Sequence, residues 1–152
     1  MLAHGRIELL GHPVCSAEVM IESKRVLITG GAGFIGSALT RRLIEANDVV
    51  VFDNGHRDAL SSSGLLGHPR LRVVRGDVLD PEALRSVMPG VQVILHLAAI
   101  AGVDTVLKMP VTTMRVALFG SYNVLDVAVA AGGWSGSSIF PPARCSAPTP
   151  TR

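Results

Sequence analysis

The sequence predicts an α/β fold: a Rossmann-type doubly wound parallel sheet truncated after about four strands, in the order 3-2-1-4. Two observations carry this prediction. Short, continuous apolar runs alternate with helical patterns between residues 23 and 133, as expected for strands buried on both faces. A run of glycines then joins the first apolar run directly to the first helical pattern.

The segment Arg25 to Gly36, which reads RVLITGGAGFIG, predicts the first strand, a glycine turn and the start of a helix. Gly30 permits a tight turn, Gly33 lets main-chain N–H groups approach a pyrophosphate, and Gly36 lets the helix pack close to the sheet. The helix N-terminus supplies unpaired donors and a positive dipole end. The segment therefore indicates a dinucleotide site; a purely structural glycine turn is the alternative.

The first helix follows these glycines without the Lys-Ser/Thr pair of a mononucleotide phosphate loop. We place its first residues, Phe34 and Ile35, in the predicted cofactor site. The helical spacing predicts one apolar face and an outward polar face. The apolar face comprises Phe34, Ile35, Ala38, Leu39 and Leu43, and the outward residues are Arg41, Arg42 and Glu45.

The run from Asp48 to Phe52 predicts the second strand, which ends at Asp53. Asp53 follows the glycines at about the 20-residue offset where an acidic residue binds the adenosine ribose. We therefore predict NAD rather than NADP, although Arg57 lies close enough in sequence to weaken the preference. Asp53, Asn54 and Gly55 also form a good turn sequence, and both interpretations are compatible. Asn54 joins Asp53 in the predicted site.

The third strand is expected at Leu71 to Val74, after a polar surface connection. Asp77 and Val78 follow it at the carboxyl end of the sheet, where we expect them to meet the adenine; a loop-capping role for Asp77 is the alternative. Asp80 and Pro81 then predict a helix start, with the carboxylate as N-cap.

The fourth strand is expected at Val91 to Leu95, running into His96 and the small residues of an HLAA sequence. Leu97, Ala98 and Ala99 are predicted to line the ribose and nicotinamide side, because large side chains there would block a flat cofactor. His96 has no carboxylate partner nearby in sequence. We interpret it as a positioned strand-end histidine rather than a catalytic one.

Residues 111–131 predict a long helix closed by Gly132 and Gly133. Its apolar positions recur every three or four residues, and further apolar residues widen the stripe nearly all round. Such a helix needs cover on more than one side. We therefore expect a homo-oligomer that forms through this helix.

Composition excludes several classes of protein. The chain has 152 residues, a net charge of +2 and scattered basic residues, with one Trp and one Tyr, so we predict no nucleic-acid partner. No apolar run reaches the ~18 residues of a membrane span, so no membrane association is expected. Cys15 and Cys145 are interpreted as free thiols in a reducing compartment, and the cytoplasm is the expected location.

The sequences TGGAGFIG (29–36), FDN (52–54), RGDV (75–78), HLAA (96–99) and LFGSYNVLDVA (118–128) resemble the extended short-chain dehydrogenase/reductase family, especially NAD-dependent epimerases and dehydratases of nucleotide sugars. The resemblance spans roughly residues 24–133. It implies NAD as cofactor, a nucleotide sugar as the substrate of a complete homologue, and transient oxidation of the sugar. It also implies that the glycines hold the pyrophosphate, Asp53 the ribose, and Asp77 and Val78 the adenine.

The family's catalytic residues are not matched. Ala117 stands where the family usually has Asn, and the Ser/Thr and the Tyr-x-x-x-Lys pair have no counterpart: Tyr122 has Asp126 four residues on. Proton transfer needs that tyrosine. We predict no catalytic residue and expect the chain to be inactive alone. A non-catalytic dinucleotide-binding or sensor module, or a non-functional truncated remnant, is the alternative.

The ends of the chain differ from its middle. Residues 1–22 are interpreted as an N-terminal extension, and residues 134–152 as an irregular tail rich in Pro and Ser. The change in composition suggests a frameshift or truncation near Gly133. Four strands leave the fourth as an apolar edge, which predicts marginal stability and association.

Overall fold

The computed structural model describes residues 21–132, which contain a four-stranded parallel sheet. The strands are β1 (Arg25–Thr29), β2 (Asp48–Asp53), β3 (Leu71–Arg75) and β4 (Val93–His96). Their order, β3-β2-β1-β4, confirms the prediction. β4 begins two residues later than expected and ends on His96, which is paired with Thr29 across the sheet.

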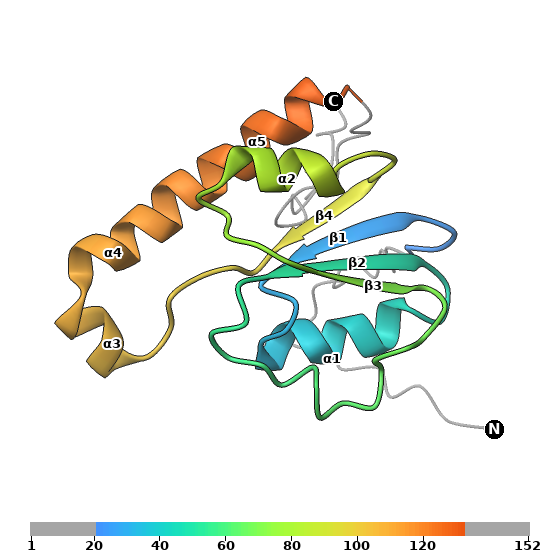
Figure 1. Cartoon of the computed structure of the whole chain (residues 1–152), viewed down its shortest axis with the longest axis horizontal. Coiled ribbons are helices and arrows are strands. Elements are labelled where there is room, and N and C mark those ends of the chain that lie inside the picture. The colour runs from blue at the N-terminus through green and yellow to red at the C-terminus, as the bar shows by residue number, and fades with distance from the viewer. Residues whose placement is uncertain (1–20, 133–152) are drawn as a thin grey trace, which may run out of the picture. The chain divides into compact units, whose positions relative to one another are not determined.

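Helices cover both faces of the sheet (Figure 1). α1 (Phe34–Leu43) lies on one face, and α2 (Pro81–Val87) and α5 (Ser121–Ala130) lie on the other. α3 (Val103–Lys108), which the sequence analysis did not predict, leads into α4 (Pro110–Arg115). A π-helical turn, η1 (Val116–Gly120), then joins α4 to α5, so the predicted long helix is present with a local change of winding.

The core has one layer on each side of the sheet, because the side chains of the central strands alternate between the two faces. Leu27, Val50 and Phe52 pack with α2 and α5, whereas Val26, Ile28 and Val51 pack on the side of α1. All six are at most 2% exposed. The continuous apolar runs of β1 and β2 are thus explained by helices on both faces.

The predicted apolar face of α1 is wrong at Phe34, Ile35 and Ala38, which are exposed, whereas Leu43 packs against the core as expected. Phe34 is 85% exposed and Ile35 is 64% exposed, whereas Gly36, Ser37 and Thr40 are buried. A Cβ on Gly36 would lie 2.4 Å from the Cα of Gly31, so the helix approaches the glycine turn through its smallest residues. This close approach turns the large side chains of the first turn outward.

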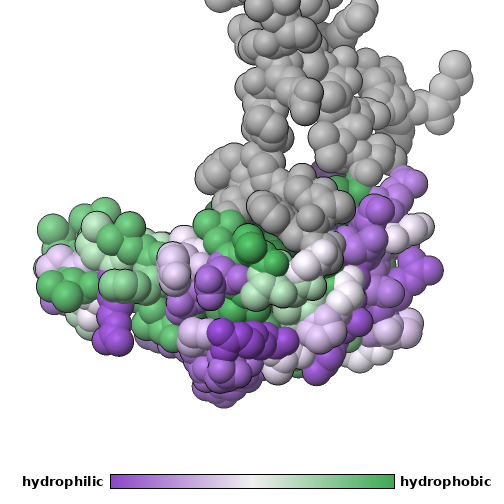
Figure 2. Space-filling view, turned by 90° about the horizontal axis from the view of Figure 1, so that it is seen from above, coloured by the Kyte–Doolittle hydropathy of each residue, from purple (hydrophilic) through white to green (hydrophobic). Residues whose placement is uncertain are grey.

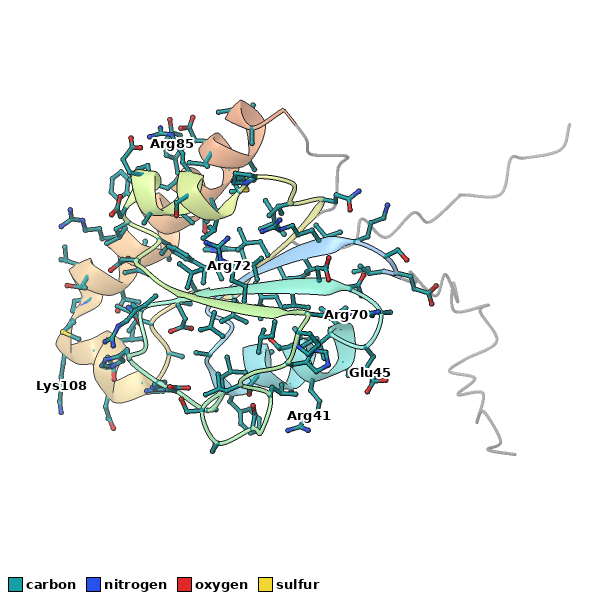
Figure 3. The ribbon with its side chains drawn as sticks, turned by 45° about the vertical axis from the view of Figure 1, so that its right-hand side comes forward. Arg41, Glu45, Arg70, Arg72, Arg85 and Lys108 are labelled. Atoms are coloured by element: carbon teal, nitrogen blue, oxygen red, sulfur yellow. The ribbon has the colours of Figure 1, made fainter. Side chains whose placement is uncertain are left out.

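The connection between β2 and β3 lies against the α1 side of the sheet. Leu60 is 1% exposed and belongs to the core there, and its N–H donates to the Ala32 carbonyl at 3.2 Å. Arg41 donates to the Ser63 carbonyl at 2.6 Å, and Arg70 donates to the Glu45 carbonyl at 2.8 Å (Figure 3). These bonds fasten the connection to α1 and its end.

The expected apolar edge is only partly present. β4 does lie at an edge of the sheet, but its Val93 and Ile94 side chains are buried. The more exposed edge is β3. Its Val73 is 46% exposed, and the same strand carries the exposed Arg72 and Arg75. Charged side chains on an edge strand oppose edge-to-edge pairing. Among the described residues, no helix is both long and apolar enough to cross a membrane.

Candidate cofactor site

The glycine turn between β1 and α1 forms the centre of the site. Gly30 has a φ of +71°, and its N–H donates to the Phe52 carbonyl at 2.9 Å. A Cβ on Gly30 would lie 2.6 Å from the Ala98 backbone nitrogen, so the turn rests directly on the residues that follow β4. Only glycine satisfies both the positive φ and this contact.

The first turn of α1 presents free donors beside this glycine turn. Gly33 occupies the N-cap position without a side-chain cap, and the first turn contains no acidic residue. Gly33 donates its own N–H to the Gly30 carbonyl, but within residues 21–132 the N–H groups of Phe34, Ile35 and Gly36 have no acceptor. Unpaired donors at the positive end of a helix favour an anionic group.

Asp53 lies at the carboxyl end of β2 and is bonded to the glycine turn. Its Oδ2 accepts from the Ala32 N–H at 3.1 Å, and its Oδ1 accepts from the Gly55 N–H at 2.7 Å. The turn role predicted for Asp53 is therefore confirmed, while its contact with a ribose stays a prediction. Asn54 caps the same connection by accepting from the His56 N–H at 3.0 Å.

Arg57 connects two loops at this end of the sheet. Its guanidinium donates to the Ala101 carbonyl at 2.9 Å and so links the segment after β2 to the segment after β4. This bond occupies one of the five N–H donors of the guanidinium and leaves its positive charge unchanged.

Asp77 and Val78 follow β3 and take different positions. Asp77 is exposed and caps the loop, because its Oδ1 accepts from the Leu79 N–H at 2.9 Å. Val78 is buried at 5% exposure, and its carbonyl accepts from Asn123 Nδ2 of α5 at 3.0 Å. The loop-capping role of Asp77 is thus confirmed, whereas the contact of Asp77 and Val78 with the adenine stays a prediction.

The residues after β4 lie beside the glycine turn. Leu97 donates its N–H to the Thr29 carbonyl at 2.9 Å, which extends the pairing of β4 with β1. The Leu97 side chain packs on the α1 side of the sheet and Ala98 on the other side, while Ala99 is exposed. The contact of these residues with the ribose and nicotinamide stays a prediction.

His96 is held by hydrogen bonds on both ring nitrogens. Nδ1 lies 2.6 Å from Thr29 Oγ1, and Nε2 lies 3.1 Å from Ser121 Oγ. Burial lowers the pKa of His96, which favours the neutral imidazole. The interpretation as a positioned strand-end histidine agrees with this geometry.

The predicted site lacks Ser121 and Asn123, the two polar residues of α5 that contact it. Both stand in a stretch that reads as an apolar helix, so periodicity alone carried no sign of their partners. The glycine before them was a usable signal: a Cβ on Gly120 would lie 2.8 Å from Val78 Cγ2. A glycine inside a helix often marks such a close contact.

Tyr122, which the family resemblance brought into question, lies on α5. It is 62% exposed, with Asp126 one helical turn further on. Within residues 21–132 no group of three or more His, Cys, Asp or Glu side chains is arranged to hold a metal ion. The N–H groups at the start of α1 are placed to hold an anionic ligand at the carboxyl ends of the strands, as parallel α/β sheets commonly do.

Comparisons with known proteins agree with this geometry. The model of the NAD-dependent epimerase/dehydratase family matches residues 26–147. UDP-glucuronic acid decarboxylase 6 of Arabidopsis thaliana is 36% identical over 125 residues, which are 79% of this chain and 34% of that protein. The low-salt glycan biosynthesis protein Agl12 of Haloferax volcanii is 38% identical over 110 residues, 68% of this chain and 35% of that protein.

Solved structures give the same result. The dTDP-glucose 4,6-dehydratase DesIV of Streptomyces venezuelae, solved with NAD bound, superposes with a TM-score of 0.67 at 34% identity, covering 72% of this chain and 37% of that one. A UDP-N-acetylglucosamine 4-epimerase of Methanobrevibacter ruminantium gives a TM-score of 0.68 at 26% identity, covering 74% and 36%. The chain spans about a third of the length of the curated relatives it matches.

Proposed function

Because the chain belongs to the NAD-dependent epimerase/dehydratase family, we propose that residues 23–133 bind NAD as the cofactor part of a nucleotide-sugar-modifying oxidoreductase. One observation carries the proposal. Three N–H groups at the start of α1 have no acceptor among the described residues, and the Asp53 carboxylate is bonded to the same turn. Free donors beside a carboxylate fit a diphosphate joined to a ribose.

Each part of the site has a proposed role. The N–H groups of Phe34, Ile35 and Gly36 bind the pyrophosphate, with Gly30 and Gly33 giving it room. Asp53 and Asn54 face the adenosine ribose, and Asp77 and Val78 face the adenine. Leu97, Ala98 and Ala99 lie along the ribose and nicotinamide. When bound, NAD supplies a hydride acceptor.

We further propose that the chain does not turn over a nucleotide sugar by itself. The family's tyrosine acts with a lysine four residues on, whereas Tyr122 is followed by Asp126, and the lysines of the chain are Lys24 and Lys108. The catalytic residues and the sugar site would belong to a complete homologue. Cofactor binding without turnover also fits a dinucleotide sensor. Formation of NADH on adding nucleotide sugars to the chain with NAD, followed by absorbance, would contradict the proposed absence of turnover. A cytoplasmic location stays a prediction.

The test of NAD binding uses two aspartates at opposite ends of β2. NAD and NADP are titrated calorimetrically into the full chain and into Asp53→Asn and Asp48→Asn. Asp53→Asn should weaken NAD binding about tenfold, because it removes a charged acceptor from the ribose. It should also reduce the ratio of NAD affinity to NADP affinity. Asp48→Asn makes the same charge change at an exposed position and should leave binding unchanged. Absence of NAD binding by the unaltered chain would contradict the proposal.

The apolar face of α3, α4, η1 and the start of α5 supports a proposal about assembly: a second copy of the chain covers it. Figure 2 shows apolar side chains gathered over this end of the molecule. A hollow of about 420 Å³ lies there, lined by Pro110, Val111, Met114, Arg115, Leu118 and Phe119. A contiguous set of exposed apolar side chains is typical of a protein interface, and a twofold axis would let the face pair with itself.

A further inference from the structure

The start of α5 contacts two different segments of the proposed cofactor site. Ser121 and Asn123 are polar residues on this helix, immediately after the π-helical turn η1. Ser121 is bonded toward the glycine turn through His96, and Asn123 is bonded to the segment after β3. Departures from regular α-helix of this kind often occur at functional sites.

The bonds on the side of the glycine turn form a directed chain. Ser121 Oγ donates its only proton to the Ala117 carbonyl at 2.7 Å, so it accepts from His96 Nε2–H. His96 Nδ1 is then the acceptor for the hydroxyl of Thr29, at 2.6 Å. Thr29 is fully buried and directly precedes Gly30, whose backbone rests on Ala98. A change at Ser121 therefore reaches the first glycine of the turn through two hydrogen bonds.

The bond on the adenine side is direct. Asn123 Nδ2 donates to the Val78 carbonyl at 3.0 Å, and Gly120 leaves space for the Val78 side chain against the helix. Both contacts fix the backbone that follows Asp77. The two segments that would bind opposite ends of an adenosine diphosphate are thus held by residues only two positions apart in α5.

We propose that Ser121 and Asn123 are positioning residues for the dinucleotide site, with His96 transmitting the effect of Ser121 to Thr29. This inference rests on the proposed function. Neither residue needs to touch the cofactor. Each holds a backbone segment in the conformation that binds the cofactor, so that less conformational entropy is lost when the cofactor binds. The neutral Nε2–H form of His96 is part of the arrangement.

The experiment compares three variants of the full chain by NAD calorimetry. Ser121→Ala removes the acceptor for His96, and Asn123→Asp keeps the shape but removes the donor to Val78; each should weaken NAD binding about fivefold, the effect of one hydrogen bond. Ser121→Thr keeps the hydroxyl and should bind as the unaltered chain does. Ser86→Ala is the matched control, because Ser86 Oγ also donates to a carbonyl of its own helix, Ala83, on α2.

A spectroscopic measurement separates positioning from simple stability. Nitrogen NMR of the imidazole should show the Nε2–H tautomer of His96 in the unaltered chain, and Ser121→Ala should change that signal while Ser86→Ala does not. An Nδ1–H tautomer in the unaltered chain would overturn the hydrogen-bond chain. If Ser121→Ala does not fold, Ser121→Cys, which bonds more weakly, takes its place.

The outcomes distinguish this inference from the proposed function. If the unaltered chain binds NAD and the folded Ser121 and Asn123 variants bind it equally well, the positioning role is wrong and NAD binding stands. If the unaltered chain binds no NAD, both are wrong. Weakened binding in Ser121→Ala and Asn123→Asp, with Ser121→Thr and Ser86→Ala unaffected, supports the inference.

Discussion

At the scale of single residues, Gly30 is constrained in two ways. It combines a φ of +71° with a contact in which a Cβ would lie 2.6 Å from the Ala98 nitrogen. Gly64 has a similar φ of +74°, but a Cβ there would meet nothing within 4 Å. The pair therefore separates backbone strain from steric overlap.

We expect Gly64→Ala to lower the free energy of unfolding by about 1–2 kcal/mol, the effect of a left-handed backbone alone. Gly30→Ala should lower it by a further 1–3 kcal/mol or so, because the contact with Ala98 must open. Urea unfolding of the two variants measures the difference. Equal losses would show that the turn can move away from β4 without strain.

His96 makes stability depend on pH. Burial lowers the pKa of His96 below its ordinary value of 6.5, so the unfolded chain takes up the proton first as the pH falls. This contribution to stability is present above pH 6.5 and is lost as the pH falls through the lower pKa of the folded chain. We expect the free energy of unfolding to decrease from pH 7.5 downward through this range.

The measurement is urea unfolding of the unaltered chain and of His96→Asn across this range. Asn keeps a polar group near Thr29 but cannot take up a proton, so the variant should lose less stability on acidification. The other titratable groups are the same in both proteins. The difference between the two proteins in stability lost on acidification therefore measures the contribution of His96. A variant with the same or a steeper loss would contradict the assignment.

At the scale of elements, α2 depends on a cap that the sequence makes plain. Asp80 accepts from the N–H groups of Glu82 and Ala83 at 3.0 and 3.2 Å, and Pro81 occupies the first helical position. Asp80→Ala should lower the free energy of unfolding by about 1 kcal/mol, whereas Asp80→Ser, which restores a capping oxygen, should recover most of it. Unfolding in urea tests both, and an equal loss in the two variants would exclude capping as the cause.

Elements with local signals were predictable, and those that depend on distant partners were not. The strands, the glycine turn and the Asp80 cap follow from apolar runs, Gly and Pro, whose effects are local. The buried face of α1 was missed because its contacts are made by Gly36, Ser37 and Thr40, which do not count as apolar. Ser121 and Asn123 were missed because their partners, His96 and Val78, are far away in sequence.

At the scale of the whole molecule, the apolar face around α4 differs from the polar connection between β2 and β3 in how its exposed leucines are surrounded. Leu118 is 60% exposed within this apolar face. Leu66 has almost the same exposure, 54%, but stands in the polar connection between β2 and β3. Single exposed leucines are ordinary on protein surfaces, whereas a contiguous set favours association. The two positions therefore form a matched pair for testing where a second copy binds.

We expect the unaltered chain to self-associate with rising concentration and Leu118→Lys to be largely monomeric, because the lysine would have to bury a charge in the interface. Leu66→Lys should associate as the unaltered chain does. Sedimentation velocity over a concentration series measures all three. If the unaltered chain is monomeric at every concentration, it has no such interface. If the two variants associate equally, the interface lies elsewhere, because only contacts made through the apolar face distinguish Leu118 from Leu66.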